Sequence, residues 1–147
     1  MKALTLYQPF ATLVMLGYDY KWNETRKWPT KHRGKLAIHA GTGMPAWARK
    51  AARHPLVVAA LAEHGLEYET LPFGALLGTV EVRDMHRITA EFAAEQTDME
   101  RAAGDFTPGR WAWQLEDRQP YGAPVTCRGF QKLWNVPREV EYECIYS

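Results

Sequence analysis

Three charged side chains lie close together in a short segment that is rich in tryptophan. Lys21, Glu24 and Arg26 fall within six positions, and Trp22 and Trp28 flank them. An amine, a carboxylate and a guanidinium at this spacing can bind an anion, polarise a carbonyl group or move a proton. We therefore take this segment as the candidate functional site.

The alternation of a β-strand decides whether these side chains can meet. In a continuous strand Glu24 and Arg26 would share one face, whereas Lys21 would point to the other. The three converge only if the backbone bends between Lys21 and Glu24. A functional site therefore requires Lys21 to lie on a loop and the strand to begin near Asn23.

Each of these side chains has its own chemical role available. Arg26 offers a planar fork of N–H donors to a phosphate or a carbonyl group. Glu24 can accept a hydrogen bond from an exocyclic amine or hold Arg26 in place. Lys21 can donate to an oxyanion, or act as a base or nucleophile if its amine is neutral; we expect the electrostatic role first and the base second. The alternative is an exposed ladder of ion pairs, which would stabilise the protein by roughly 0–1 kcal/mol and have no function.

A cluster of basic residues overlaps the same segment. Glu24 is the only acidic residue among the fifteen positions from Lys21 to Lys35. The basic residues in this range are Lys21, Arg26, Lys27, Lys31, His32, Arg33 and Lys35. This is the local charge that a phosphate backbone requires, although a solvated loop is the alternative interpretation. Because the whole chain has a net charge of only +1, any nucleic-acid contact must come from such a local patch.

The other tryptophans and a histidine divide between core and site. Trp111 and Trp113 alternate along a strand pattern and are predicted to be core residues. Trp47 lies on an amphipathic helix pattern and is predicted to pack. Trp28 could stack on a base or belong to the core. His39 could line a cleft or be a buried structural histidine.

The composition indicates a small globular domain and excludes several functional classes. The chain has 147 residues, 46% of them hydrophobic and 24% charged, so we expect one domain over residues 1–147. Cys127 and Cys144 have no zinc-binding spacing, and the sequence contains no phosphate-binding glycine loop. No signal peptide or membrane span is expected. We expect a cytoplasmic protein, monomeric or weakly dimeric, with no metal, cofactor or membrane contact.

The hydrophobic periodicity predicts a mixture of strands and helices. Strands are expected at Lys2–Tyr7, Gly34–Ala40, Phe73–His86, Arg110–Glu116, Val125–Arg128 and Leu133–Val136. Helices are expected at Pro9–Leu16, Pro45–Arg53, Pro55–His64 and Thr89–Ala103, whereas helix and strand are both open for Pro137–Ser147. Short strands with helices between them, without a regular βαβ alternation, predict an α+β fold with a small barrel or a strongly curled sheet.

Several motifs resemble the ASCH family, which is named for homology to a domain of the activating signal cointegrator. The family motif glycine-x-lysine-x-x-glutamate-x-arginine resembles Gly17 followed by Lys21-x-x-Glu24-x-Arg26. Other similar segments extend the resemblance over nearly the whole chain: Leu6–Ala11, Trp28–Ala40, Phe73–Gly78, Gly109–Trp113 and Gly129–Trp134. One departure is that Tyr18-Asp19-Tyr20 separates the glycine from the lysine, where the family has a single residue.

The resemblance implies a PUA-like fold, a small β-barrel of about five or six short strands with flanking helices and a cleft beside the barrel. It also implies RNA, a nucleotide or a modified nucleoside as the ligand. Some similar proteins are amidohydrolases of N4-acylated cytidine and others are ribonucleases, so a hydrolase stays open beside a binding domain. A non-catalytic protein-interaction module is a further alternative. We assign catalytic roles to Lys21 and Glu24, and substrate contacts to Arg26, Thr25, Gln8, Trp28, Arg33 and His39.

The amidohydrolase-like members differ from this chain at one motif position. They have a threonine where Glu24 stands, and they pair the lysine with a glutamate on a later segment. Glu91 and Glu95 lie on a comparable segment here. The presence of Glu24 weakens a direct transfer of that mechanism.

Overall fold

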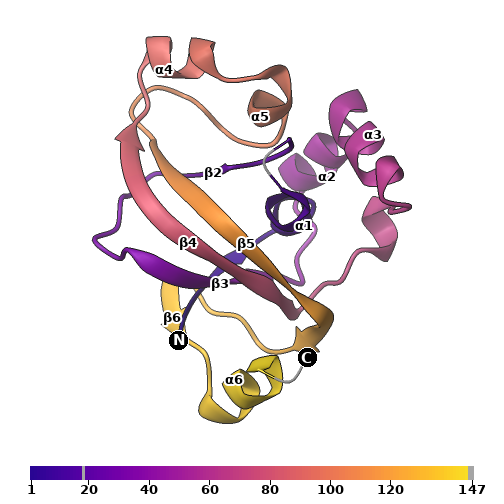
Figure 1. The fold of residues 1–147 in the computed structure, drawn as a ribbon. Helices are drawn as coiled ribbons and strands as arrows, with labels where there is room; N and C mark the ends of the chain where they lie inside the picture. Colours follow the sequence, from indigo (N-terminus) through magenta and orange to yellow (C-terminus); the bar gives the residue numbers. More distant parts are fainter. Residues whose placement is uncertain (18, 146–147) are drawn as a thin grey trace.

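The computed structural model describes residues 1–17 and 19–145 and shows a curled sheet flanked by helices (Figure 1). The strands are β1 (Lys2–Leu6), β2 (Asn23–Arg26), β3 (Gly34–Ala40), β4 (Ala75–Arg87), β5 (Trp111–Thr126) and β6 (Leu133–Asn135). The helices are α1 (Phe10–Leu16), α2 (Ala46–Ala52), α3 (Pro55–Glu63), the 3-10 helix η1 (Tyr68–Thr70), α4 (Ala90–Glu95), α5 (Asp98–Ala102) and α6 (Arg138–Ile145). Part of the spacer before Lys21, at position 18, and the end of the C-terminal segment, at 146 and 147, lie outside the described residues.

The six strands form one sheet in the order β2-β5-β4-β3-β1-β6. β1 and β3 run parallel, and the other neighbouring strands are antiparallel. Register shifts between β3 and β4, and between β4 and β5, accompany the strong curl of the sheet into a half-barrel (Figure 1). The predicted α+β fold with a strongly curled sheet is confirmed.

β4, with 13 residues, matches the strand expected at Phe73–His86 to within two residues at each end. β5 has 16 residues and is longer than predicted, because the strand expected at Arg110–Glu116 continues to Thr126 and so includes the start of the one expected at Val125–Arg128. β2 pairs with Trp111–Gln114, whereas the stretch Gln119–Thr126 pairs with β4 on its other side. Pro120 therefore lies on an edge segment of the sheet, where a missing N–H is tolerated and the strand can continue.

α1 lies inside the curl of the sheet and supplies one side of the main core (Figure 1). Ala11 and Val14 of this helix pack with strand residues that include Ile38, Val80 and Trp113. The helix ends at Leu16, and the next residue, Gly17, has a φ of 118°, a conformation that favours glycine. The expected helix is therefore present, and it begins within one residue of the predicted start.

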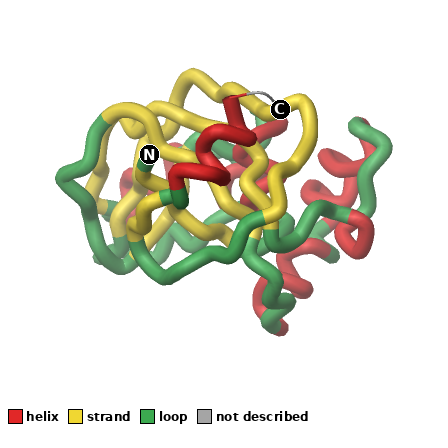
Figure 2. Tube along the Cα trace, turned by 90° about the horizontal axis from the view of Figure 1, so that it is seen from below, coloured by secondary structure: helices red, strands yellow, loops and turns green. Residues whose placement is uncertain are grey.

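The other helices cover the flanks of the sheet. α2 and α3 lie to one side, α4 and α5 lie at one end, and α6 lies across strands at the other end (Figures 1 and 2). The single helix expected over Thr89–Ala103 is interrupted, because the Thr97 hydroxyl accepts from the Glu100 N–H and starts a new helix at Asp98. No helix in the described part of the chain is long and apolar enough to cross a membrane.

Candidate functional site

The backbone turns immediately before β2, so that Lys21 and Glu24 approach each other. β2 begins at Asn23 and pairs with β5, with Glu24 opposite Trp113. Lys21 lies on the preceding loop, where its N–H donates to the Gly17 carbonyl at 3.3 Å. The bend that convergence requires is present, and Lys21 Nζ lies 3.5 Å from Glu24 Oε1.

Lys21 is a buried cation with a full set of acceptors. The residue is 1% exposed. Its Nζ donates to the carbonyls of Asn23 and Ala103, both at 2.7 Å, and pairs with Glu24. Nζ also lies 5.8 Å from the centre of the Phe10 ring, which adds a cation–π contact. Three oxygen acceptors match the three N–H donors of an ammonium group.

Glu24 links Lys21 to Arg26. Its second carboxylate oxygen accepts from Arg26 Nε at 2.8 Å, while Arg26 Nη2 donates to the Thr5 carbonyl at 2.8 Å. The side chain of Arg26 is 24% exposed, and its Nη1 group has no hydrogen-bond partner among the described residues. The three charges thus form a continuous, largely buried row rather than an exposed ladder of ion pairs.

Glu100 fixes the turn, and the sequence interpretation missed this residue. It is fully buried, and its two oxygens accept from the backbone N–H groups of Trp22 and Asn23 at 3.0 and 2.9 Å. Burial raises the pKa of Glu100, although the charge of Lys21 and the backbone hydrogen bonds oppose the shift.

A local pattern could have drawn attention to Glu100. Thr97-x-x-Glu100 has the form of a capping box, which places a glutamate in the first turn of a helix. Its side chain instead reaches back to the loop before β2. The later-segment glutamates considered from the sequence, Glu91 and Glu95, are both exposed on α4.

A cavity of about 560 Å³ opens beside this row of charges. Its size falls within the range of about 300–1,000 Å³ that small-molecule sites have. Lys21, Glu24, Thr25 and Arg26 line it together with aromatic side chains, which are Tyr7, Phe10, Trp28 and Trp47. Trp47, which the sequence predicts to pack, does so against Phe10 and Tyr7, and it is also 58% exposed and lines the cavity.

Further charges lie at the more exposed part of the cavity. Lys27 and Asp105 are exposed, and Arg110 donates from Nε to the Asp105 carbonyl and from Nη2 to the Thr25 carbonyl, both at 3.2 Å. Among the described residues that line the cavity, four are cationic and two are carboxylates. The cavity is therefore positive overall, which favours an anionic or strongly polar ligand.

Three of the residues that were assigned substrate contacts do not line this cavity. Gln8 is fully buried, where it accepts from the Thr12 N–H and donates to the Pro72 carbonyl. Arg33 is exposed and donates to the carbonyls of Thr30 and His32. The structure thus brings together Lys21, Glu24, Thr25, Arg26 and Trp28, and leaves out Gln8, Arg33 and His39.

His39 belongs to a buried network behind the cavity wall. Its Nε2 lies 2.7 Å from the Cys127 carbonyl, and its Nδ1 lies 3.1 Å from the Thr5 hydroxyl oxygen, which also accepts from Trp134 Nε1. Burial lowers the pKa of His39, and the hydrogen bond to Cys127 opposes the shift. This is the environment of a structural histidine, one of the two roles left open by the sequence.

The described residues offer no metal site. Nowhere in residues 1–17 and 19–145 do three His, Cys, Asp or Glu side chains gather as metal ligands would.

The basic segment that follows Arg26 is mostly exposed, with Lys27, Lys31, Arg33 and Lys35 accessible, and Lys27 connects it to the cavity.

Solved structures provide the comparison for this fold. The crystal structure of the ASCH protein from Zymomonas mobilis matches with a TM-score of 0.56 and 15% identity, over 99% of this chain and 93% of that chain. Crystal structures of two mutants of that protein match with TM-scores of 0.55 and 0.57 at 14% and 16% identity, over 99% of this chain and 96% and 94% of theirs. A scan against family models and a search of curated proteins found no match. At this identity the likeness concerns the fold alone, and the chain has an ASCH-like fold over nearly its whole length, in agreement with its motifs.

Proposed function

We propose that this protein binds an RNA nucleotide or a modified nucleoside in the cavity beside β2. The observation that carries the proposal is the buried row Lys21–Glu24–Arg26, which opens onto a positive cavity with aromatic walls. Charges are buried at a free-energy cost, and a cavity that presents them among aromatic rings is the usual form of a small-molecule site. The ASCH-like fold supports the proposal only by analogy.

The roles of the polar groups follow from their free hydrogen-bonding capacity. Arg26 Nη1 can donate to a carbonyl or phosphate oxygen of the ligand. Each Glu24 oxygen has a second lone pair, which can accept from an exocyclic amine. A base that carries an amine beside a carbonyl group would satisfy both residues, whereas Lys27 and Arg110 at the exposed part can attract a phosphate.

Hydrolysis is the second candidate function, and the position of Lys21 favours it. A fixed ammonium at a cavity wall stabilises the oxyanion that forms when water adds to an amide carbonyl. We propose this electrostatic role for Lys21, with Glu24 holding the geometry. The reaction would be the hydrolysis of an acyl group from N4-acylated cytidine, or alternatively the cleavage of RNA.

The test is a binding titration at low salt with N4-acetylcytidine and with a structured RNA, followed by analysis of products. Arg26→Gln should weaken binding by about 10-fold to 150-fold, because a hydrogen bond to a charged group contributes about 1.5–3 kcal/mol. Arg83→Gln is the matched control, since Arg83 is 68% exposed, pairs with Glu116 and lies outside the cavity.

The outcomes separate the candidates. Turnover that disappears in Lys21→Ala supports the hydrolase, and binding without turnover supports the binding domain. If Arg26→Gln and Arg83→Gln weaken binding equally, the cavity is not the site. If wild-type protein binds neither probe, the nucleotide proposal fails and a protein-interaction module remains.

A further inference from the structure

Trp47 presents an aromatic ring to solvent at the cavity, although its helix is short and rich in alanine. The residue is 58% exposed, whereas Ala48 and Ala52 of the same helix are buried. A tryptophan usually lies in the core, but the burial of α2 does not depend on Trp47. An exposed ring that lines a cavity is available for contact with a ligand.

Neighbouring rings hold the Trp47 side chain in a fixed orientation. Its ring lies 5.7 Å from that of Phe10 at an interplanar angle of 17°, and 5.4 Å from that of Tyr7 at 88°. The backbone of Gly43 packs under Tyr7 so closely that a Cβ there would lie 2.8 Å from Tyr7 Cε1. Phe10 therefore covers one face of the indole, and the exposed surface lies on the rest of the ring.

A second indole on the cavity wall is also held in place. Trp28 packs edge-on against Trp113 at 5.0 Å, and its carbonyl accepts from Trp113 Nε1 at 3.2 Å. The cavity thus combines rigid flat surfaces with the positive side chains of Lys27 and Arg110. A planar ring with an attached negative group matches this combination, and rigid walls lower the entropy that binding would lose.

We propose that Trp47 is the platform on which an unpaired base stacks, which makes single-stranded RNA or a free nucleotide, not a duplex, the ligand class. This inference rests on the proposed function, because it assigns the base-contacting residue of the same cavity. Stacking requires an open face of the base, and bases inside a duplex have both faces covered by their neighbours. Since every base has a π-face, Trp47 provides selection for an unpaired base rather than for one sequence.

The experiment compares wild-type protein with Trp47→Leu and Trp47→Phe by titration calorimetry. The probes are a short single-stranded RNA, its duplex with the complementary strand, and ribose 5-phosphate, which has no base. Trp47→Leu should bind the single strand roughly 5-fold to 150-fold more weakly, as expected for the loss of one base–aromatic stack. Trp47→Phe should retain part of the affinity, and ribose 5-phosphate should bind all three proteins equally.

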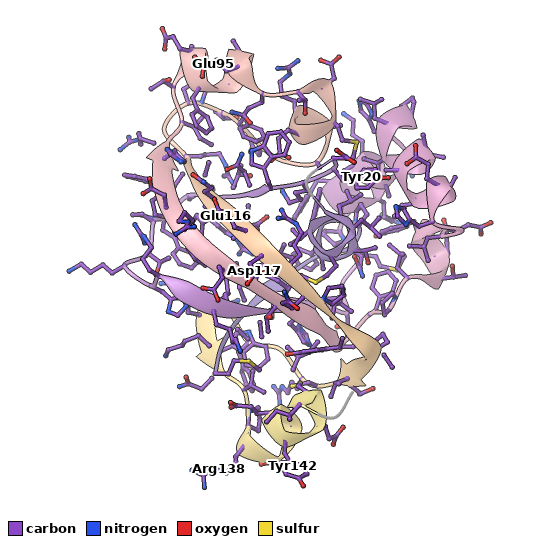
Figure 3. All side chains as sticks on the ribbon, viewed as in Figure 1. Tyr20, Glu95, Glu116, Asp117, Arg138 and Tyr142 are labelled. Carbon is purple, nitrogen blue, oxygen red and sulfur yellow. The ribbon has the colours of Figure 1, made fainter. Side chains whose placement is uncertain are left out.

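Tyr142→Leu is the matched control for removal of an exposed aromatic residue. Tyr142 is 63% exposed on α6, away from the end that carries α4 (Figure 3), and it does not line the cavity. Its replacement should leave the affinity for the single strand unchanged. Near-ultraviolet circular dichroism of each variant checks that the fold is intact.

Three results would overturn the inference in different ways. If Trp47→Leu binds the single strand as wild-type protein does, the platform is wrong and nucleotide binding stands. If Trp47→Leu weakens ribose 5-phosphate and the single strand equally, Trp47 supports the structure and does not stack on a base. If wild-type protein binds none of the probes, both this inference and the proposed function fail.

Discussion

The carboxylate of Glu100 holds the turn before β2, and its removal should loosen the candidate site. Glu100 accepts from the N–H groups of Trp22 and Asn23, the two residues between Lys21 and Glu24. Because Glu100 is fully buried, water cannot readily take the place of its carboxylate as the acceptor for these two N–H groups. Replacement of this side chain therefore tests whether the turn depends on a residue from a distant part of the chain.

The magnitude follows from the two hydrogen bonds and the buried charge. Glu100→Ala would leave two backbone N–H groups unpaired, at about 1–3 kcal/mol each. Removal of the charge offsets part of this loss, because burial disfavours the ionised carboxylate relative to water and so raises the pKa of Glu100. We expect the free energy of unfolding to fall by about 2–4 kcal/mol for Glu100→Ala, and by about 1–2 kcal/mol for Glu100→Gln, which retains one acceptor oxygen.

Urea unfolding measures this loss, with an unchanged slope expected for both variants. The matched control is Glu95→Ala, because Glu95 is an exposed carboxylate on α4 at the outer end of the molecule (Figure 3). It should change the free energy of unfolding by less than about 0.5 kcal/mol. Equal stabilities of Glu100→Ala and Glu95→Ala would refute the reasoning.

The pH dependence of the free energy of unfolding provides a second test of Glu100. The folded protein binds the Glu100 proton more tightly than the unfolded chain does, since the pKa is raised above its ordinary value of 4.5. The stability that protonation adds is present below pH 4.5 and is lost as the pH rises through the folded pKa. Relative to Glu100→Gln, wild-type protein should therefore gain stability on acidification through this window.

Two further changes test the scaffold around the cavity. Because burial lowers the pKa of His39 below 6.5, the unfolded chain takes up the proton first; stability should fall as the pH drops below 6.5, more in wild-type protein than in His39→Gln, and parallel urea profiles would contradict this. Gly78→Ala would place a Cβ 2.5 Å from the Gln119 carbonyl oxygen and 2.7 Å from Pro120 Cα, so thermal unfolding should show a loss of about 2 kcal/mol. A loss below about 0.5 kcal/mol would mean that β4 and β5 can separate at this point.

Local patterns were sufficient to show where a bend must lie if the three charged side chains form a site. The alternation of Glu24 and Arg26 places both on one face of β2, and the same alternation means that Lys21 can join them only if the backbone bends before the strand. The structure agrees, since β2 begins at Asn23. Gly17 at the end of α1 and Thr89 at the start of α4 are local signals of the same kind, because each depends on the chemistry of one residue at a helix end.

Contacts between distant segments could not be predicted in this way. Asn23 and Glu100 are separated by 77 positions, and no periodicity connects them. His39 stands in an alternating strand pattern with Lys35, yet both faces of β3 are covered near its end, so His39 is buried. Trp47 packs only against neighbouring rings and stays exposed, because the buried residues of α2 are Ala48 and Ala52.

The hydrogen bonds of Lys21 favour one chemical role over another. A neutral amine has two N–H bonds and a lone pair, so it could not serve the carbonyls of Asn23 and Ala103 together with Glu24. Action as a base would therefore require Lys21 to give up one buried contact, whereas its positive charge acts without rearrangement. Direct contact with a ligand then falls to Arg26, whose Nη1 group has no partner among the described residues. Loss of the Arg26 fork should consequently weaken binding even where the Lys21 charge is retained.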